Sequence, residues 1–295
     1  MSDLSLLILC GRSPRHLYLA NRLCEAGRPL AIVHETGVHW DLRKIARSLK
    51  PANLLRKVWR KLRDRPRYAG GAEARYFFGA ATPSLNRSDL VFEVPHINHP
   101  DLVALADRLQ PDIIAVFGTS LIGGPLLRCG RLGLLNLHGG LSPEYRGADC
   151  TFWALFNGEP DKVGCTLHFI NAGIDTGSLI AQVSPPITAV DNELTLFWGG
   201  VKASAEVYAE VLDRLERGER LGAEQPNKGH LYQVRQRGWR HERQLDARLR
   251  AGMLKDVSLP LRVTWFKSDE AGNAIPTQTG SGRPDPALTS PLQAV

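Results

Sequence analysis

Paired cysteines, long apolar runs and a basic leader are all lacking in this chain of 295 residues. The five cysteines are scattered without a CxxC pair, which is typical of a reducing cytoplasm and argues against a disulfide framework or a zinc site. The longest uncharged stretches fall short of the roughly 20 residues that span a bilayer. The first residues, MSDLSLLILC, carry an acid before their apolar run. We therefore expect a first strand rather than a signal peptide, no transmembrane segment, and a cytoplasmic protein.

A metal site is not expected either. His96 and His99 form an HxxH in VPHINHPD, but the neighbouring sequence supplies no third ligand of the kind that a metal site needs.

Positive charge is concentrated in one segment, although the net charge of the whole chain is +7. Residues 43–67 hold eleven Lys and Arg residues against a single acid, Asp64. Apolar residues recur at helical spacing within this segment, so part of it is predicted to be a basic amphipathic helix. Such a helix can be the solvated face of an insertion, or it can meet a nucleic acid, an anionic membrane surface or a phosphorylated substrate. A homodimer is also compatible with the sequence.

Apolar strands alternate with helices along most of the chain. Strands are predicted over residues 4–10, 30–34, 90–94, 112–117, 134–138, 164–170 and 178–184. Helices are predicted over residues 14–27, 99–110 and 148–157, with a short helix within 121–129 and a long one that runs from an N-cap at Asp191 to Leu215. The last two strands are either a hairpin or neighbours. Continuous apolar strands that alternate with helices indicate an α/β fold, a doubly wound and mostly parallel sheet.

The composition divides the chain into three parts. Residues 1–221 are expected to form the main α/β domain, with the basic insert at about 41–82 and a loop rich in Gly and Ala at 69–81. Residues 222–268 are again basic and are expected to be a small appendage. Residues 269–295 are rich in Gly, Pro, Ser and Thr, and we expect a disordered tail.

Two polar residues mark the carboxyl end of one apolar strand. Asn136 and His138 are two positions apart, so their side chains lie on the same face of a strand. In an open parallel sheet, sites form outside the carboxyl ends of the strands. An amide and an imidazole at such a place can hold and protonate an oxygen that becomes negative during a reaction.

A third residue, Asp175, lies in the turn between two later strands. An aspartate near His138 would fix the imidazole tautomer and raise its pKa, which favours a protonated ring that stabilises an oxyanion. Ser142 and Cys150 lie off the strand without a GxSxG turn, so no nucleophile is expected. Such a site suits attack by an external nucleophile, as in direct transfer of an acyl-type group. Each of the three residues also has an ordinary structural role in turns or at a strand end, and physical reasoning alone leaves both readings open.

The segment NLHGGLSPEYRGA (136–148), followed by GCTLHFINAGIDTGSLIAQ (164–182), resembles the paired signature of the formyltetrahydrofolate-dependent formyltransferases. This family includes methionyl-tRNA formyltransferase, glycinamide ribonucleotide formyltransferase and sugar N-formyltransferases. The resemblance covers residues 111–215 well and the first strand and helix loosely. It implies a Rossmann-like formyltransferase fold and a catalytic set of Asn136, His138 and Asp175.

The resemblance also implies a formyl donor, 10-formyltetrahydrofolate, and the loops that hold it. One loop follows the strand at 112–117, and the other precedes Asp175, with main-chain groups that can read a flat heterocycle between apolar walls. The positions that match these loops are Ser120, Leu121 and Ile122, and then Ile170, Asn171, Ala172 and Gly173.

Three departures from the family pattern concern the acceptor. Gly140 stands where the family commonly has a serine, so Gly140, Tyr145 and Arg146 are expected to set contacts to the acceptor. The first turn, CGRSPRH, lacks the Gly-Ser-Asn phosphate loop of the glycinamide ribonucleotide enzymes, which counts against purine synthesis. The carboxyl-terminal region shows no run of short strands expected of a tRNA-binding barrel, so nucleic acid is disfavoured without being excluded.

The expected activity is formyl transfer to a primary amine of a small molecule, with a nucleotide-linked amino sugar as first candidate and an amino acid or peptide amine as second. A hydrolase that releases formate from the same donor could use the same three residues. A non-catalytic or nucleic-acid-associated protein on the same fold is a third class, favoured only by the basic insert.

Overall fold

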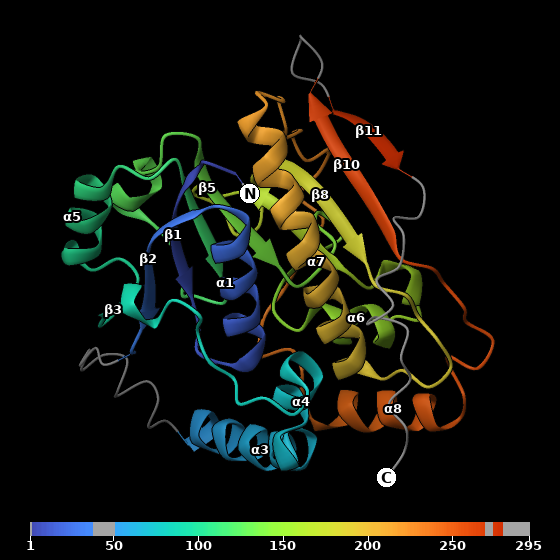
Figure 1. Ribbon diagram of the computed structural model, residues 1–295. Helices are drawn as coiled ribbons and strands as arrows, with labels where there is room; N and C mark the ends of the chain where they lie inside the picture. The colour runs from blue at the N-terminus through green and yellow to red at the C-terminus, as the bar shows by residue number, and fades with distance from the viewer. Residues whose placement is uncertain (1, 38–50, 269–273, 280–295) are drawn as a thin grey trace.

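A nine-stranded sheet runs through the computed structural model, which describes residues 2–37, 51–268 and 274–279 (Figure 1). The strand order is β11-β10-β8-β7-β5-β4-β1-β2-β3. The first five strands, β1 to β5, pair in parallel, and β7, β8, β10 and β11 extend the sheet in antiparallel pairs. The bounds are β1 (Ser5–Cys10), β2 (Arg28–Glu35), β3 (Val91–Val94), β4 (Ile113–Phe117), β5 (Gly133–His138), β7 (Cys165–Phe169), β8 (Leu179–Ser184), β10 (Arg262–Ser268) and β11 (Ala274–Thr279). β7 and β8 are thus an antiparallel pair, which settles the alternative left open above.

Helices cover both faces of the sheet, which confirms the predicted doubly wound architecture. α1 (Pro14–Ala26) and α7 (Glu193–Glu216) lie together on one face, and α5 (Pro100–Leu109) lies on the other (Figure 1). Strand β1 is buried at every position, because Leu6 and Ile8 belong to the core under α1 and α7 while Leu7 and Leu9 belong to the core under α5. This two-sided burial explains its unbroken apolar sequence.

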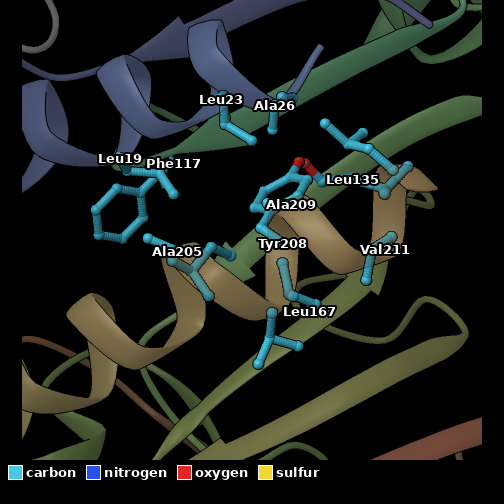
Figure 2. Packing of buried hydrophobic residues seen from close by; sticks show 14 of the residues in the cluster. Leu19, Leu23, Ala26, Phe117, Leu135, Leu167, Ala205, Tyr208, Ala209 and Val211 are labelled. Atoms are coloured by element: carbon cyan, nitrogen blue, oxygen red, sulfur yellow. The ribbon is translucent and has the colours of Figure 1, made fainter. Parts of the chain in front are cut away.

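The core under α1 and α7 anchors the strand that carries the predicted site (Figure 2). Tyr208 of α7 is fully buried there, and its hydroxyl donates a hydrogen bond to the carbonyl of Leu135 on β5 at 2.7 Å. A buried hydroxyl is stable only with such a partner. The bond therefore ties the long helix to β5 directly before Asn136.

The strand order reverses between β1 and β4, since β2 and β3 continue to one side of β1 while β4 and β5 lie on the other. A crevice at the carboxyl ends of the strands is the usual ligand site of such a sheet. Asn136 and His138 lie at that end of β5.

Of the basic insert expected at about 41–82, residues 41–50 lie outside the described residues, and the described part contains two helices where the sequence indicated one helix and a loop. α3 (Pro51–Arg67) confirms the amphipathic helix. The loop expected at 69–81 is wrong, because a short 3-10 turn, η1 (Ala69–Gly71), leads into α4 (Ala72–Phe78). α4 buries Phe77 and places Tyr76 against Trp198 of α7, with ring centroids 5.4 Å apart. Packing of these aromatic residues thus stabilises a helix in a segment whose glycines had indicated a loop.

α3 turns its apolar residues to solvent and two of its arginines inward. Leu55 and Leu62 are 70% and 63% exposed, whereas Arg63 and Arg67 form ion pairs with acids of the protein body. The positive charge of α3 is therefore directed in part toward the interior of the protein.

The expected appendage at 222–268 shares the main sheet. It contains β9 (His230–Tyr232), α8 (Trp239–Arg250) and β10, and β10 pairs with β8. β9 pairs in parallel with the short strand β6 (Tyr145–Gly147). The expectation of a disordered tail is wrong for residues 274–279, which form β11 and pair with β10. Residues 269–273 and 280–295 lie outside the described residues.

The remaining predicted elements differ in detail. The short helix within 121–129 is a 3-10 turn, η3 (Gly124–Arg128), and two further 3-10 turns are η2 (Ser88–Leu90) and η4 (Pro160–Lys162). The helix α6 spans Cys150–Phe156. The N-cap of α7 is Asn192 rather than Asp191, because the Asn192 side chain accepts from the main-chain N–H groups of Leu194 and Thr195. Asp191 instead accepts from Thr188 and Thr195.

Two features are absent from the described part of the chain. No helix in it is long and apolar enough to cross a membrane. Within the same residues, no group of three or more His, Cys, Asp or Glu side chains could hold a metal ion.

Candidate active site

Asn136, His138 and Asp175 come together at the carboxyl end of β5, joined by a fourth residue, His168 of β7. Asn136 and His168 are direct partners in the antiparallel β5–β7 pair, and Asn136 Nδ2 lies 3.1 Å from His168 Nε2. Asp175 Oδ2 lies 3.4 Å from His138 Nδ1, and its Oδ1 lies 3.6 Å from His168 Nε2. One carboxylate thus contacts both imidazoles.

His168 orients the Asn136 amide. Its Nδ1 lies 2.7 Å from the carbonyl of Phe169, an acceptor, so a neutral His168 carries its proton on Nδ1 and accepts through Nε2. Asn136 must then present its NH₂ group to His168. One N–H is used by that bond, and the other is left to donate to a developing oxyanion.

Both ring nitrogens of His138 face acceptors. Nδ1 faces the Asp175 carboxylate, and Nε2 lies 3.0 Å from the carbonyl of Tyr145. A neutral imidazole has a single N–H and can donate to only one of them. A second proton on the ring would satisfy both.

The expected rise in the pKa of His138 is not what the structure gives. Burial lowers the pKa below its ordinary value, and the charge of Asp175 opposes this without overcoming it. The imidazole is therefore neutral at neutral pH, and it can take up a proton when negative charge develops beside it.

Asp175 is ionised throughout the ordinary pH range. Burial alone would raise its pKa, but its interactions with His138 and His168 and a hydrogen bond from the main-chain N–H of Gly147 lower it to about 2. The Gly147 bond is 2.9 Å long. Gly147 has φ +87°, and a Cβ there would lie 2.3 Å from the Tyr232 carbonyl, so only glycine fits this position.

Cys150 lies nearer to the site than its sequence position indicated, with Sγ 3.6 Å from His138 Nε2. Burial raises the pKa of its thiol well above the ordinary value, and nearby Asp175 and Asp149 raise it further. A thiol held in its protonated form is a poor nucleophile. Cys150 is therefore not expected to act as the nucleophile.

A cavity of about 590 Å³ opens at the Asn136 side of this group, within the size range of small-ligand sites. Of the seven positions expected to hold the donor, five line it, and Asn171 and Ala172 do not. Asn171 instead braces the loop, since its Oδ1 accepts from the Gly173 N–H and the Thr176 hydroxyl. The five lining positions are Ser120, Leu121, Ile122, Ile170 and Gly173.

A second cavity, of about 340 Å³, meets the first at three residues that line both, His138, Gly139 and Gly147. Charged side chains dominate it, in contrast to the largely apolar first cavity. They come from α1, α3, the start of α6, α7 and the loop before α8, and they are Arg15, Arg60, Arg63, Asp64, Arg67, Asp149, Glu193 and Arg237. The basic insert thus reaches the site through α3.

The three residues expected to contact the acceptor do not line either cavity among the described residues. The Tyr145 hydroxyl donates to Glu159, and Arg146 donates to the Ile174 carbonyl at 3.0 Å. A Cβ at Gly140 would lie 2.7 Å from Cys150 Sγ, so the glycine makes room for this thiol. All three residues support the loop that follows β5.

Sequence reasoning missed several residues of the site. His168 was visible as a polar residue inside an apolar strand, and its cross-strand pairing with Asn136 would have implicated it. Tyr232, Val234 and Arg237 carried no local signal, because they reach the cavities through the long-range pairing of β9 with β6.

Comparison with known proteins points to one family. The family described as Formyl transferase matches residues 66–212. The chain is 34% identical over 159 residues to a methionyl-tRNA formyltransferase of Chlorobium phaeovibrioides, a match that covers 52% of this chain and 48% of that protein. It is also 34% identical over 125 residues to a methionyl-tRNA formyltransferase of Chlorobium chlorochromatii, covering 42% and 40%. The chain therefore spans about half or less of the length of these curated relatives.

Two solved structures share the fold over nearly the whole chain. A 4-N formyltransferase from Francisella tularensis matches with a TM-score of 0.52 and 12% identity, covering 93% of this chain and 96% of that one. A sugar N-formyltransferase from Shewanella sp FDAARGOS_354 matches with a TM-score of 0.52 and 14% identity, covering 96% and 99%. At such identities the likeness shows the fold alone. Together with the family match over residues 66–212, it confirms the predicted resemblance to the formyl transferases.

Proposed function

We propose that this protein transfers a formyl group from 10-formyltetrahydrofolate to a primary amine of a small acceptor. One observation carries the proposal, namely two cavities of different character that meet at His138. The larger cavity suits the flat ring system and apolar contacts of the donor. The smaller, charged cavity suits an amine that bears further polar groups.

The two cavities favour transfer over hydrolysis. Hydrolysis of the donor needs only a water molecule at the formyl carbon. A cavity of about 340 Å³ is large enough for a small organic molecule and is lined by fixed charges. An acceptor there can reach the formyl carbon from the side opposite to the donor cavity.

In the reaction, the amine nitrogen forms a bond to the formyl carbon and loses a proton, and the bond from that carbon to N10 of the folate breaks as N10 gains a proton. Asn136 donates its free N–H to the oxyanion of the tetrahedral intermediate. His138 exchanges its contact with the Tyr145 carbonyl for the same oxygen and takes up the second ring proton as charge develops. Asp175 holds His138 and stabilises its charged form.

The acceptor proposed first is a nucleotide-linked amino sugar. Its support is Arg60, which lines the smaller cavity, called the acceptor cavity below. Arg60 has no ion pair to any described residue, so it can bind a phosphate oxygen. Relatives named methionyl-tRNA formyltransferase match about half of the chain, so methionyl-tRNA is the competing acceptor.

The proposal is tested with Asn136→Ala, using 10-formyltetrahydrofolate and a panel of glucosamine 6-phosphate, a UDP-linked amino sugar and methionyl-tRNA. Products are followed by mass spectrometry and by the appearance of tetrahydrofolate. Loss of one oxyanion donor should lower kcat about 10²- to 10³-fold with little change in stability. Asn86→Ala, at an exposed position in a distant loop, is the matched control.

Turnover of Asn136→Ala close to that of the control would remove Asn136 from the chemistry. Formate release by the unaltered protein at the same rate with and without every amine would support the hydrolase instead.

A further inference from the structure

Asp149 occupies an unusual place at the start of α6. It stands at the N-cap position, where an aspartate ordinarily accepts from main-chain N–H groups of the first turn, yet its side chain makes no capping bond. Its backbone has φ +58°, in the left-handed region, which is rare for any residue but glycine. The Asp149 side chain thus does not cap the helix, and its backbone adopts a conformation that is unfavourable for a residue other than glycine.

One carboxylate oxygen of Asp149 is left without a partner. Oδ1 accepts from Arg237 at 2.9 Å. Oδ2 is buried and has no hydrogen-bond partner, and it is the only such atom among the described residues that line the acceptor cavity. A buried carboxylate oxygen without a partner is costly, so its retention at a cavity wall points to a ligand group that completes it.

The charges linked to Asp149 favour a positive group there. Ion pairs join four carboxylates to three guanidinium groups in one continuous network. One negative charge is therefore uncompensated within it. The carboxylates are Asp64, Asp149, Glu193 and Glu242, and the guanidinium groups are those of Arg63, Arg67 and Arg237. Both oxygens of Glu193 are bound by arginines, and within the network Asp149 Oδ2 is the buried carboxylate oxygen that has no partner among the described residues.

We infer that Asp149 is the positioning residue for the acceptor amine, and that the acceptor enters as an ammonium ion paired with Asp149 Oδ2. This inference rests on the proposed formyl transfer. Asp149 directly precedes Cys150, whose Sγ lies 3.6 Å from His138, so an ammonium held there is close to the reacting carbon. Before attack, the ammonium loses one proton to solvent, and the neutral amine then forms the new nitrogen–carbon bond.

The test compares a charged and an uncharged nucleophile in the full-length protein. Glucosamine 6-phosphate is largely an ammonium at neutral pH, and hydroxylamine is not. Asp149→Asn keeps the size of the side chain and its contact with Arg237 but removes the charge. Its kcat/KM for glucosamine 6-phosphate should fall about 10- to 100-fold, mostly through KM, as expected for loss of a hydrogen bond to a charged group. Its rate with hydroxylamine should stay within about twofold of the unaltered protein.

Glu242→Gln is the matched control, because Glu242 belongs to the same ion-pair network without lining the acceptor cavity. An equal loss with both nucleophiles, or an equal loss in Asp149→Asn and Glu242→Gln, would show that Asp149 acts only through the network and would overturn the inference. Asp149→Ser gives a second variant if the asparagine folds poorly, judged by Tm. An unaltered protein that formylates none of these amines would refute formyl transfer itself, whereas normal transfer by Asp149→Asn would refute only the role of Asp149.

Discussion

Asp175→Asn removes the negative charge of this side chain but keeps its size, so it should reveal what the charge contributes. The pKa of Asp175 is lowered from 3.8 to about 2. Each unit corresponds to about 1.36 kcal/mol, so the ionised carboxylate contributes about 2 kcal/mol to the free energy of unfolding at neutral pH. Because the folded-state pKa is the lower one, this contribution is fully present above the ordinary pKa of Asp and is lost as the pH falls toward about 2.

The expected result is a variant about 2 kcal/mol less stable at pH 7, with the difference reduced to about 1 kcal/mol at pH 3. Urea denaturation followed by tryptophan fluorescence measures both values, and Asp256→Asn, at an exposed position after α8, is the control. The variant should also lose formyl transfer by at least about 10²-fold, because His138 loses the charge that stabilises its protonated form. A difference from the unaltered protein that is the same at both pH values would refute the account of Asp175.

Three further predictions concern the frame of the site. Tyr208→Phe removes the buried bond to the Leu135 carbonyl and should lower the free energy of unfolding by about 1–3 kcal/mol, whereas an unchanged urea midpoint would contradict the anchoring role of α7. Gly118→Ala should lower Tm and weaken donor binding, because φ is +69° and a Cβ would lie 2.1 Å from His16 Nε2; a normal Tm would show that the His16 ring moves freely. Burial lowers the pKa of His16 to about 3. Because the unfolded chain takes up this proton already near pH 6.5, the free energy of unfolding should fall as the pH drops below about 6.5, by up to about 4–5 kcal/mol near pH 3. In urea titrations, His16→Gln should make the free energy of unfolding depend less on pH between about 3 and 6.5. An unchanged dependence would contradict the role of His16.

Local sequence patterns predicted seven strands of the main sheet but missed β10 and β11, and together with the family resemblance they indicated the first three site residues. Asn136 and His138 share a strand, and the motif that contains Asp175 lies one antiparallel pair away, so strand periodicity and motif order brought them together. The pKa of His138 was predicted in the wrong direction, because the sequence shows a charged neighbour but does not show how completely the ring is buried.

The acceptor side depends on contacts that no local pattern encodes. Asp149 looked like an ordinary helix start, and only the ion pair with Arg237, 88 positions later, reveals its other role. The arginines of α3 suggested a solvated face, yet Arg67 turns inward to Glu193 of α7. Ion pairs between residues far apart in the sequence form the wall of the second cavity. The sequence therefore predicted the positions that line the donor cavity better than those that line the acceptor cavity.

The central claim is amine-dependent formyl transfer through Asn136, His138 and Asp175. The most direct measurement is the rate of tetrahydrofolate formation from 10-formyltetrahydrofolate, with and without the amine panel, for the unaltered protein and for Asn136→Ala, His138→Ala and Asp175→Ala. The account predicts an amine-dependent rate, a formylated amine formed in equal amount to tetrahydrofolate, and near-complete loss of both in each folded variant. Near-normal turnover in any two variants, or a rate that no amine changes, would contradict it.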